Sequence, residues 1–189
     1  VGCGAGAFDR QLKERTEDAP EVWGIEMDPA AAARAGGTVD RVLVGDALEI
    51  VPGLPANHFD CVVMNDVLEH LEAPERLLAS LRPALKPGAA LVASIPNVRH
   101  FFNVVDLVVH GRWDYVDEGI LDRTHLRFFT RSSMVRLFEE AGYTLETIEG
   151  INPTGSLKFK LVNLLTLGRW SDMRYLQFAC RARRAKEES

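Results

Sequence analysis

The chain opens with three glycines at alternate positions, Gly2, Gly4 and Gly6, in the stretch VGCGAGAF directly before a segment with helical character. Glycines in a strand-to-helix turn let the backbone approach a ligand closely. The spacing satisfies G-x-G-x-G, and read from Gly2 through Gly4 to Ala7 it also satisfies the dinucleotide form G-x-G-x-x-A. The loop alone therefore fits a dinucleotide, an adenosyl compound or a tight turn without a ligand.

Carboxylates follow the next two predicted strands. Glu26 ends the first of them, and a carboxylate at that place accepts hydrogen bonds from ribose hydroxyls in either kind of ligand. Asp46 stands just beyond the next strand, in VLVGDALEI, where a carboxylate can accept from an adenine amino group. The two positions together favour an adenosyl ligand.

These residues need a scaffold of short buried strands and amphipathic helices. The strands are predicted at Val22–Glu26, Arg41–Val44, Phe59–Asn65, Ala89–Ile95, Tyr143–Ile148 and Tyr175–Arg181. The helices are predicted at Phe8–Arg15, Pro29–Ala35, Pro74–Leu85, from Phe101 to a stop at Gly111, from a cap at Thr130 to a stop at Gly142, and at Leu157–Leu167. Pro83 should weaken the last turn of the third helix, which Lys86–Gly88 ends. The alternation predicts a parallel sheet whose strands end at one ligand-binding edge.

Composition and charge limit the partners. The 189 residues are 47% hydrophobic and 26% charged, which suits one globular domain. A net charge of −5 disfavours a general nucleic-acid binder, so no nucleic-acid partner is predicted. The basic run Arg181, Arg183, Arg184 and Lys186, beside Glu187 and Glu188, is interpreted as a solvated tail.

The spacing of the cysteines and the hydropathy of the chain indicate in which cellular compartment the protein is expected. Cys3, Cys61 and Cys180 are far apart and without zinc-ligand or redox spacing, which fits a reducing, cytoplasmic location. No apolar run reaches the roughly 18 residues of a membrane span, so stable membrane insertion is not predicted.

An ordered set of stretches resembles the class I S-adenosylmethionine-dependent methyltransferases. The matching stretches are Val1–Phe8, Gly24–Pro29, Gly45–Ala47, Phe59–Leu71, Leu85–Pro96 and Phe128–Tyr143, in the family's order and at its spacing. A closer resemblance, carried by SIPNVRH and GRWDYVDEGILDRTHLRFFT, is to bacterial methyltransferases associated with glycan or cell-surface polysaccharide synthesis.

The resemblance implies a fold. It is an α/β, Rossmann-like, doubly wound and mostly parallel seven-stranded sheet, with helices on both faces and a helical cover. The whole chain, 1–189, would be one methyltransferase domain, with 97–129 and 153–171 as cover insertions on the substrate side. Since the family places a strand before the glycine turn at the centre of the sheet, we expect the sequence to be an N-terminally truncated fragment that lacks most of this strand.

The resemblance also implies S-adenosylmethionine as cofactor, with S-adenosylhomocysteine as product, and a set of residues that bind it. These are Gly2, Gly4 and Gly6 along the methionine part, Glu26 on the ribose hydroxyls, Met27 against the adenine, Asp46 and Ala47 at the adenine edge, and Asn65, Asp66, Val67 and Leu68 at the methionine end. For Asp66 a helix N-cap is an equal alternative.

Catalysis needs few fixed residues, because a methyl sulfonium is already electrophilic and a base helps only if the acceptor arrives protonated. The candidates are His125, oriented by Asp122, then His70 and His100; each has a structural alternative, which for His125 is a hairpin that satisfies it through the backbone. No pattern forces a metal site. Asp66, Glu69 and His70 are close in sequence, but two of them would be needed by the cofactor pocket or a cap, so no metal is predicted.

Three functions remain open. The first is methyl transfer to an oxygen or nitrogen acceptor on a small molecule or glycan precursor. The second is a nicotinamide-dependent oxidoreductase using the same loop, although no Tyr-x-x-x-Lys pair is present. The third is a non-catalytic cofactor-binding domain. The apolar face of Leu157–Leu167 fits a cover helix, a homodimer contact or a membrane-surface helix, with the cover favoured.

Overall fold

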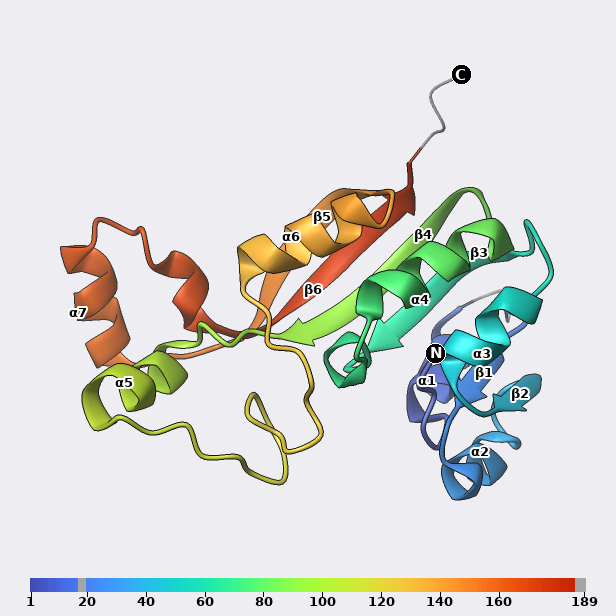
Figure 1. Cartoon of the computed structure of the whole chain (residues 1–189), viewed down its shortest axis with the longest axis horizontal. Coiled ribbons are helices and arrows are strands. Elements are labelled where there is room, and N and C mark those ends of the chain that lie inside the picture. The colour runs from blue at the N-terminus through green and yellow to red at the C-terminus, as the bar shows by residue number, and fades with distance from the viewer. Residues whose placement is uncertain (17–19, 186–189) are drawn as a thin grey trace.

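The structure is a computed structural model that describes residues 1–16 and 20–185. Its strands are β1 (Trp23–Glu26), β2 (Arg41–Val44), β3 (Phe59–Asn65), β4 (Leu85–Pro96), β5 (Tyr143–Pro153) and β6 (Tyr175–Arg184). Its α-helices are α1 (Ala7–Arg15), α2 (Pro29–Ala35), α3 (Ala47–Ile50), α4 (Pro74–Leu81), α5 (Phe101–His110), α6 (Arg131–Glu140) and α7 (Leu157–Leu165). Helices and strands alternate through most of the chain, as the sequence predicts (Figure 1).

The strands of the described residues form two sheets instead of the one seven-stranded sheet that was expected. Strands β1 and β2 make a parallel pair, and the larger sheet has the order β3-β4-β6-β5. In the larger sheet β3, β4 and β5 run in the same direction, and β6 alone is reversed, because it pairs antiparallel with both β4 and β5. The larger sheet is therefore mixed.

The first residues of the chain lie between the two sheets. The Val1 nitrogen donates to the carbonyl of Val63 in β3 at 2.8 Å, and the Gly2 nitrogen donates to the carbonyl of Ile25 in β1 at 2.8 Å. The glycine loop thus reaches β1 on one side and β3 on the other.

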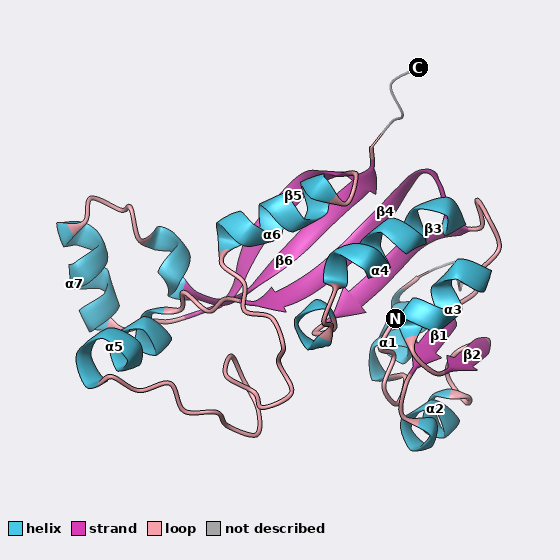
Figure 2. Cartoon of the chain, viewed as in Figure 1, coloured by secondary structure: helices cyan, strands magenta, loops and turns pink. Residues whose placement is uncertain are grey.

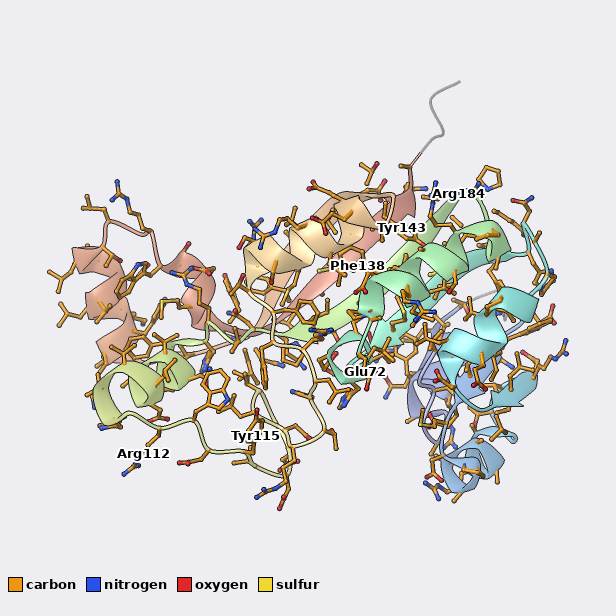
Figure 3. The ribbon with its side chains drawn as sticks, viewed as in Figure 1. Glu72, Arg112, Tyr115, Phe138, Tyr143 and Arg184 are labelled. Carbon is orange, nitrogen blue, oxygen red and sulfur yellow. The ribbon has the colours of Figure 1, made fainter. Side chains whose placement is uncertain are left out.

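One face of the larger sheet forms the core. Helices α4 and α6 lie on that face (Figures 1 and 2), where Phe138 of α6 is fully buried and the hydroxyl of Tyr143 donates to the Leu78 carbonyl of α4 at 2.8 Å (Figure 3). Along β4, Leu91 and Ala93 are buried while the alternating Val92 is only half-buried. The expected helices on both faces are therefore not found over this sheet in the part that the structure describes.

Several helix and strand boundaries differ from the prediction. Helix α4 ends at Leu81, and a 3-10 turn at Arg82–Ala84 leads into β4 at Leu85, so Lys86–Gly88 lies in the strand instead of ending a helix. Pro83 explains the early end, since it has no N–H to donate to the helix. The short helix α3 was not predicted; it begins at Asp46, whose side chain accepts from the Leu48 nitrogen at 2.8 Å.

The prediction of a solvated basic tail was wrong for its first part. Strand β6 continues to Arg184, and Arg181 and Arg183 both form ion pairs with Glu146 of β5. Lys186, Glu187 and Glu188 lie outside the described residues.

Helices α5 and α7 pack against each other at one end of the molecule (Figure 1), around Phe101, Phe159 and Met173. A long loop, residues 111–130, returns from α5 to α6 and passes the end of the larger sheet (Figure 2). Among the described residues, none of the helices combines the length and apolar character that crossing a bilayer requires.

Candidate active site

The glycine turn has the backbone that its sequence predicts. Gly2, Gly4 and Gly6 have backbone φ angles of 65°, 53° and 77°. This is the left-handed region, which residues other than glycine adopt only with strain. A Cβ on Gly2 would come within 2.7 Å of the Val67 side chain, whereas one on Gly4 would meet nothing within 4 Å. Gly2 is therefore required by the packing of the loop, and Gly4 faces open space.

Glu26 connects the turn to the end of β1. Its Oε2 accepts from the Gly4 nitrogen at 2.7 Å, and its Oε1 accepts from the Asp28 nitrogen at 3.0 Å. The neighbouring Met27 is 66% exposed. The turn, the carboxylate and an accessible apolar side chain thus meet at one strand end, as an adenosyl site requires.

Asp46 and Ala47 stand at the end of the neighbouring strand β2. Besides capping α3, the carboxylate of Asp46 is half-buried, and Ala47 is buried in the core. The structure places these two residues one strand away from Glu26, since β1 and β2 pair in parallel with Glu26 opposite Val44.

At the end of β3, Asn65 and Asp66 are exposed, while the side chain of Leu68 is fully buried in the core. Asp66 has a φ of 52°, and its Oδ1 accepts from the Gln177 amide at 2.7 Å. The 3-10 turn Leu68–His70 that follows has no side-chain cap, so the cap interpretation of Asp66 is not observed.

His70 and His125, far apart in the sequence, come together just after Asp66. Their rings meet edge to face with centroids 4.7 Å apart. The 111–130 loop brings His125 there, because the nitrogens of Leu126 and Arg127 donate to the Glu69 carbonyl at 2.8 and 2.9 Å. The Arg127 guanidinium also donates to the carbonyl of Glu72, which Figure 3 labels.

The hydrogen bonds define the tautomer of both imidazoles. Nδ1 of His125 lies 2.9 Å from the Ile120 carbonyl, which can only accept, so Nδ1 carries the hydrogen. Nδ1 of His70 lies 3.1 Å from the Thr124 hydroxyl, which gives its own hydrogen to Asp122 at 2.6 Å. In these tautomers the lone pair of each neutral ring is on Nε2.

Asp122 thus differs from its predicted role. It was expected to orient His125, but its carboxylate binds Thr124 and so positions His70, while the side chain of His125 is held by a backbone carbonyl.

Glu69 lies beside the two histidines and was missed as a site residue. It is 1% exposed, and neither carboxyl oxygen has a hydrogen-bond partner among the described residues. Burial raises the pKa of this carboxyl to about 8, and the neighbouring Asp66 carboxylate adds to the shift. From the sequence, Glu69 was considered with Asp66 and His70 as a metal set and set aside, and no local signal indicated its burial beside His125.

His100 is not part of this cluster. It lines a cleft of about 360 Å³ together with Arg112, Asp106 and Asp114, and burial lowers its pKa. Ile120, whose carbonyl holds His125, also lines this cleft, and so does Leu176, which precedes the Gln177 that binds Asp66. The cleft and the histidine pair are therefore adjacent.

The glycine turn, the strand-end carboxylates and the adjoining polar cleft define an α/β protein with an adenosyl-ligand edge. Residues 1–148 match the family model described as a methyltransferase domain, and the chain belongs to that family. The chain is therefore an enzyme, a methyltransferase whose cofactor is S-adenosylmethionine. The nicotinamide-dependent and non-catalytic alternatives are set aside.

Curated relatives and solved structures agree with this family. The ubiquinone biosynthesis O-methyltransferase of Burkholderia pseudomallei is 25% identical over 190 residues, which cover 96% of this chain and 76% of the relative. That of an Azoarcus species is 27% identical over 188 residues, or 95% and 75% of the two chains. A SAM-dependent methyltransferase from Archaeoglobus fulgidus superposes with a TM-score of 0.72 at 19% identity, covering 96% of this chain and 83% of that one, which shows a shared Rossmann-like fold.

Proposed function

We propose that this enzyme methylates an oxygen or nitrogen atom of a small, hydroxyl-rich acceptor such as a glycan precursor. The cofactor would lie on Gly2, Gly4 and Gly6, with Glu26 and Met27 at its ribose and adenine. Asp46 and Ala47 would complete the adenine edge, and Asn65, Asp66 and Leu68 the methionine end. Residues 97–129 and 153–171 would form the acceptor side of a single domain.

The observation that supports this acceptor class is the lining of the cleft beside His125. It combines the carboxylates of Asp106 and Asp114, the guanidinium of Arg112, the amide of Asn103 and the imidazole of His100. Carboxylate, amide and guanidinium groups form the directional hydrogen bonds that hydroxyl groups need, which an apolar pocket would not supply. Figure 3 shows Arg112 on the long loop that borders this cleft.

The chemistry is an in-line displacement. The acceptor oxygen or nitrogen loses its proton, its lone pair forms the new bond to the methyl carbon, and the carbon–sulfur bond breaks with its electron pair left on sulfur. Nε2 of His125 is the basic atom proposed at this end of the site, since Nδ1 is committed to Ile120. The lone pair on Nε2 can assist the reaction in two ways: it can accept the proton of the acceptor directly, or it can bind a metal cation. A metal titration distinguishes these two mechanisms.

The test is a transfer assay with methyl-labelled S-adenosylmethionine and a panel of nucleotide sugars. We expect label in at least one hydroxyl-rich acceptor. His125→Ala should lower turnover by about 10²–10⁴-fold, with S-adenosylhomocysteine affinity unchanged. His110→Ala, at an exposed position on α5, is the matched control. Full turnover by His125→Ala would leave His125 with its structural role alone.

A second candidate follows from the named activity of the relatives, O-methylation in ubiquinone biosynthesis. An acceptor with a long apolar tail would need an apolar groove, and one of about 540 Å³ lies between α7 and the start of β6, lined in part by Phe159, Leu164 and Leu167. Label appearing in polyprenylated phenols and not in nucleotide sugars would favour this candidate.

A further inference from the structure

Glu69, His70 and His125, here called the Glu-His-His cluster, bring three potential metal ligands to one place. One ligand atom from each residue lies within 4.8 Å of the others. Around a zinc ion with bonds near 2.0–2.2 Å, ligand atoms lie about 3–3.5 Å apart. Small side-chain adjustments, of about 1 Å, would therefore close the cluster on an ion.

The hydrogen bonds hold the two histidines in the tautomer that a metal needs. Each ring donates its Nδ1 hydrogen to an oxygen of the 120–124 segment, His125 to Ile120 and His70 to Thr124. In the neutral form of each ring, the lone pair is then on Nε2. Metal-binding histidines are held in this way, by a carbonyl or carboxylate-linked group on the other nitrogen.

Glu69 supplies the independent observation. A carboxyl group that is 1% exposed normally has hydrogen-bond partners, because burying an unpaired polar group costs free energy. Hydrogen-bond partners are missing for both oxygens of Glu69 among the described residues, and the groups beside them are the imidazoles of His70 and His125 and the carboxyl group of Asp66. A bound cation would give this buried carboxyl group the partner that it lacks in the part of the chain that the structure describes.

We propose that Glu69, His70 and His125 bind a divalent first-row transition metal ion. Two imidazoles and one carboxylate are the protein ligands of catalytic Zn²⁺ sites, and the same set serves Fe²⁺. Mg²⁺ prefers oxygen ligands alone and fits this cluster less well. The sequence predicted no metal site, because Glu69 or its neighbours would be needed by the cofactor pocket or by a helix cap. Our proposal differs from that prediction, because Glu69 has neither role in the structure.

The metal site rests on the proposed function in one respect: only the proposed function places the Glu-His-His cluster next to the methyl group of the cofactor. A bound ion with open positions would hold the acceptor oxygen and lower its pKa, so that its proton leaves to solvent. His125 would then act as a ligand instead of a base.

The experiment is a titration of Zn²⁺ into the metal-stripped protein by calorimetry, with Co²⁺ absorption as a second readout. We expect one equivalent to bind with micromolar or tighter affinity and to give the visible Co²⁺ bands of nitrogen and oxygen ligation. Glu69→Gln and His125→Gln should each weaken Zn²⁺ by more than tenfold. Thr124→Val, which only removes the hydroxyl that positions His70, should weaken it by about 10–100-fold.

Matched controls lie nearby. Glu72→Gln, three residues from Glu69 and exposed, and His110→Gln, on an exposed face of α5, should bind Zn²⁺ as the unmodified protein does. Should a buried substitution fail to fold, Thr124→Val at an exposed position still tests the site.

The outcomes are separable from those of the proposed function, because S-adenosylhomocysteine is titrated into the same samples. Cofactor binding without Zn²⁺ binding, or Zn²⁺ binding equal in all variants, overturns the metal site and leaves the methyltransferase intact. Weaker Zn²⁺ binding in the Glu69, His125 and Thr124 variants alone supports the site, whatever the acceptor proves to be.

Discussion

At the scale of single residues, Glu26 is the most direct test of the cofactor edge. Glu26→Ala should weaken S-adenosylhomocysteine binding by about 1.5–3 kcal/mol, the range for hydrogen bonds to a charged group, because it removes the proposed ribose acceptor and releases the Gly4 nitrogen it holds at 2.7 Å. Calorimetry measures the change. Glu140→Ala, on an exposed position of α6, is the control, and equal affinities in both variants would remove Glu26 from the site.

The residues that we propose to bind the adenosyl group could be selected from the sequence, because glycines in a turn and carboxylates at strand ends leave local signals. The Glu-His-His cluster could not. Glu69 and His125 are 56 positions apart, and only the docking of the 111–130 loop onto the Glu69 carbonyl joins them. The role of Thr124 between Asp122 and His70 is likewise a property of the folded loop.

At the scale of elements, we expect two glycines of the loop to have different roles: Gly2 contributes to the stability of the fold, and Gly4 to the binding of the cofactor. Gly2→Ala should lower the free energy of unfolding by about 2–4 kcal/mol, since it combines a positive φ with a contact at 2.7 Å to Val67. Gly4→Ala should cost only about 1–2 kcal/mol of backbone strain, yet weaken S-adenosylhomocysteine binding by about tenfold or more, because its Cβ would enter the open ligand side.

Denaturant unfolding and calorimetry on the two variants check this contrast. A Gly4→Ala protein that binds the cofactor normally would show that the ligand does not lie along that side of the loop.

Element positions were predicted well where hydrophobic period and turn residues agree. The first three predicted strands and α1, α2, α5 and α6 are found near their predicted bounds, whereas β4 begins at Leu85 instead of Ala89. The differences have local causes that compete with the pattern. Pro83 ends α4 early, the cap by Asp46 starts α3, and ion pairs to Glu146 extend β6 to Arg184.

At the scale of the whole molecule, the larger sheet and its helices hold the site in place. Tyr143→Phe should lower stability by about 1–2 kcal/mol, because it leaves the buried Leu78 carbonyl without the hydroxyl at 2.8 Å. Thermal unfolding should shift down by about 2–8 °C. Tyr115→Phe, on the exposed loop in Figure 3, should leave the midpoint unchanged; equal shifts would contradict the assignment.

The α/β class could be predicted from the alternation of strands and helices. The order and direction in which the strands pair could not. Pairing between strands is set by contacts between distant segments, so the antiparallel place of β6 between β4 and β5 left no sign in local periodicity.

The measurement that tests the account most directly is a calorimetric titration of S-adenosylhomocysteine into the protein, with NAD as the control. We expect micromolar binding of S-adenosylhomocysteine and no heat from NAD, because Glu26, Met27 and Asp46 are the residues that we propose hold an adenosyl group beside the glycine turn. Binding of NAD, or of neither compound by a folded protein, would contradict it.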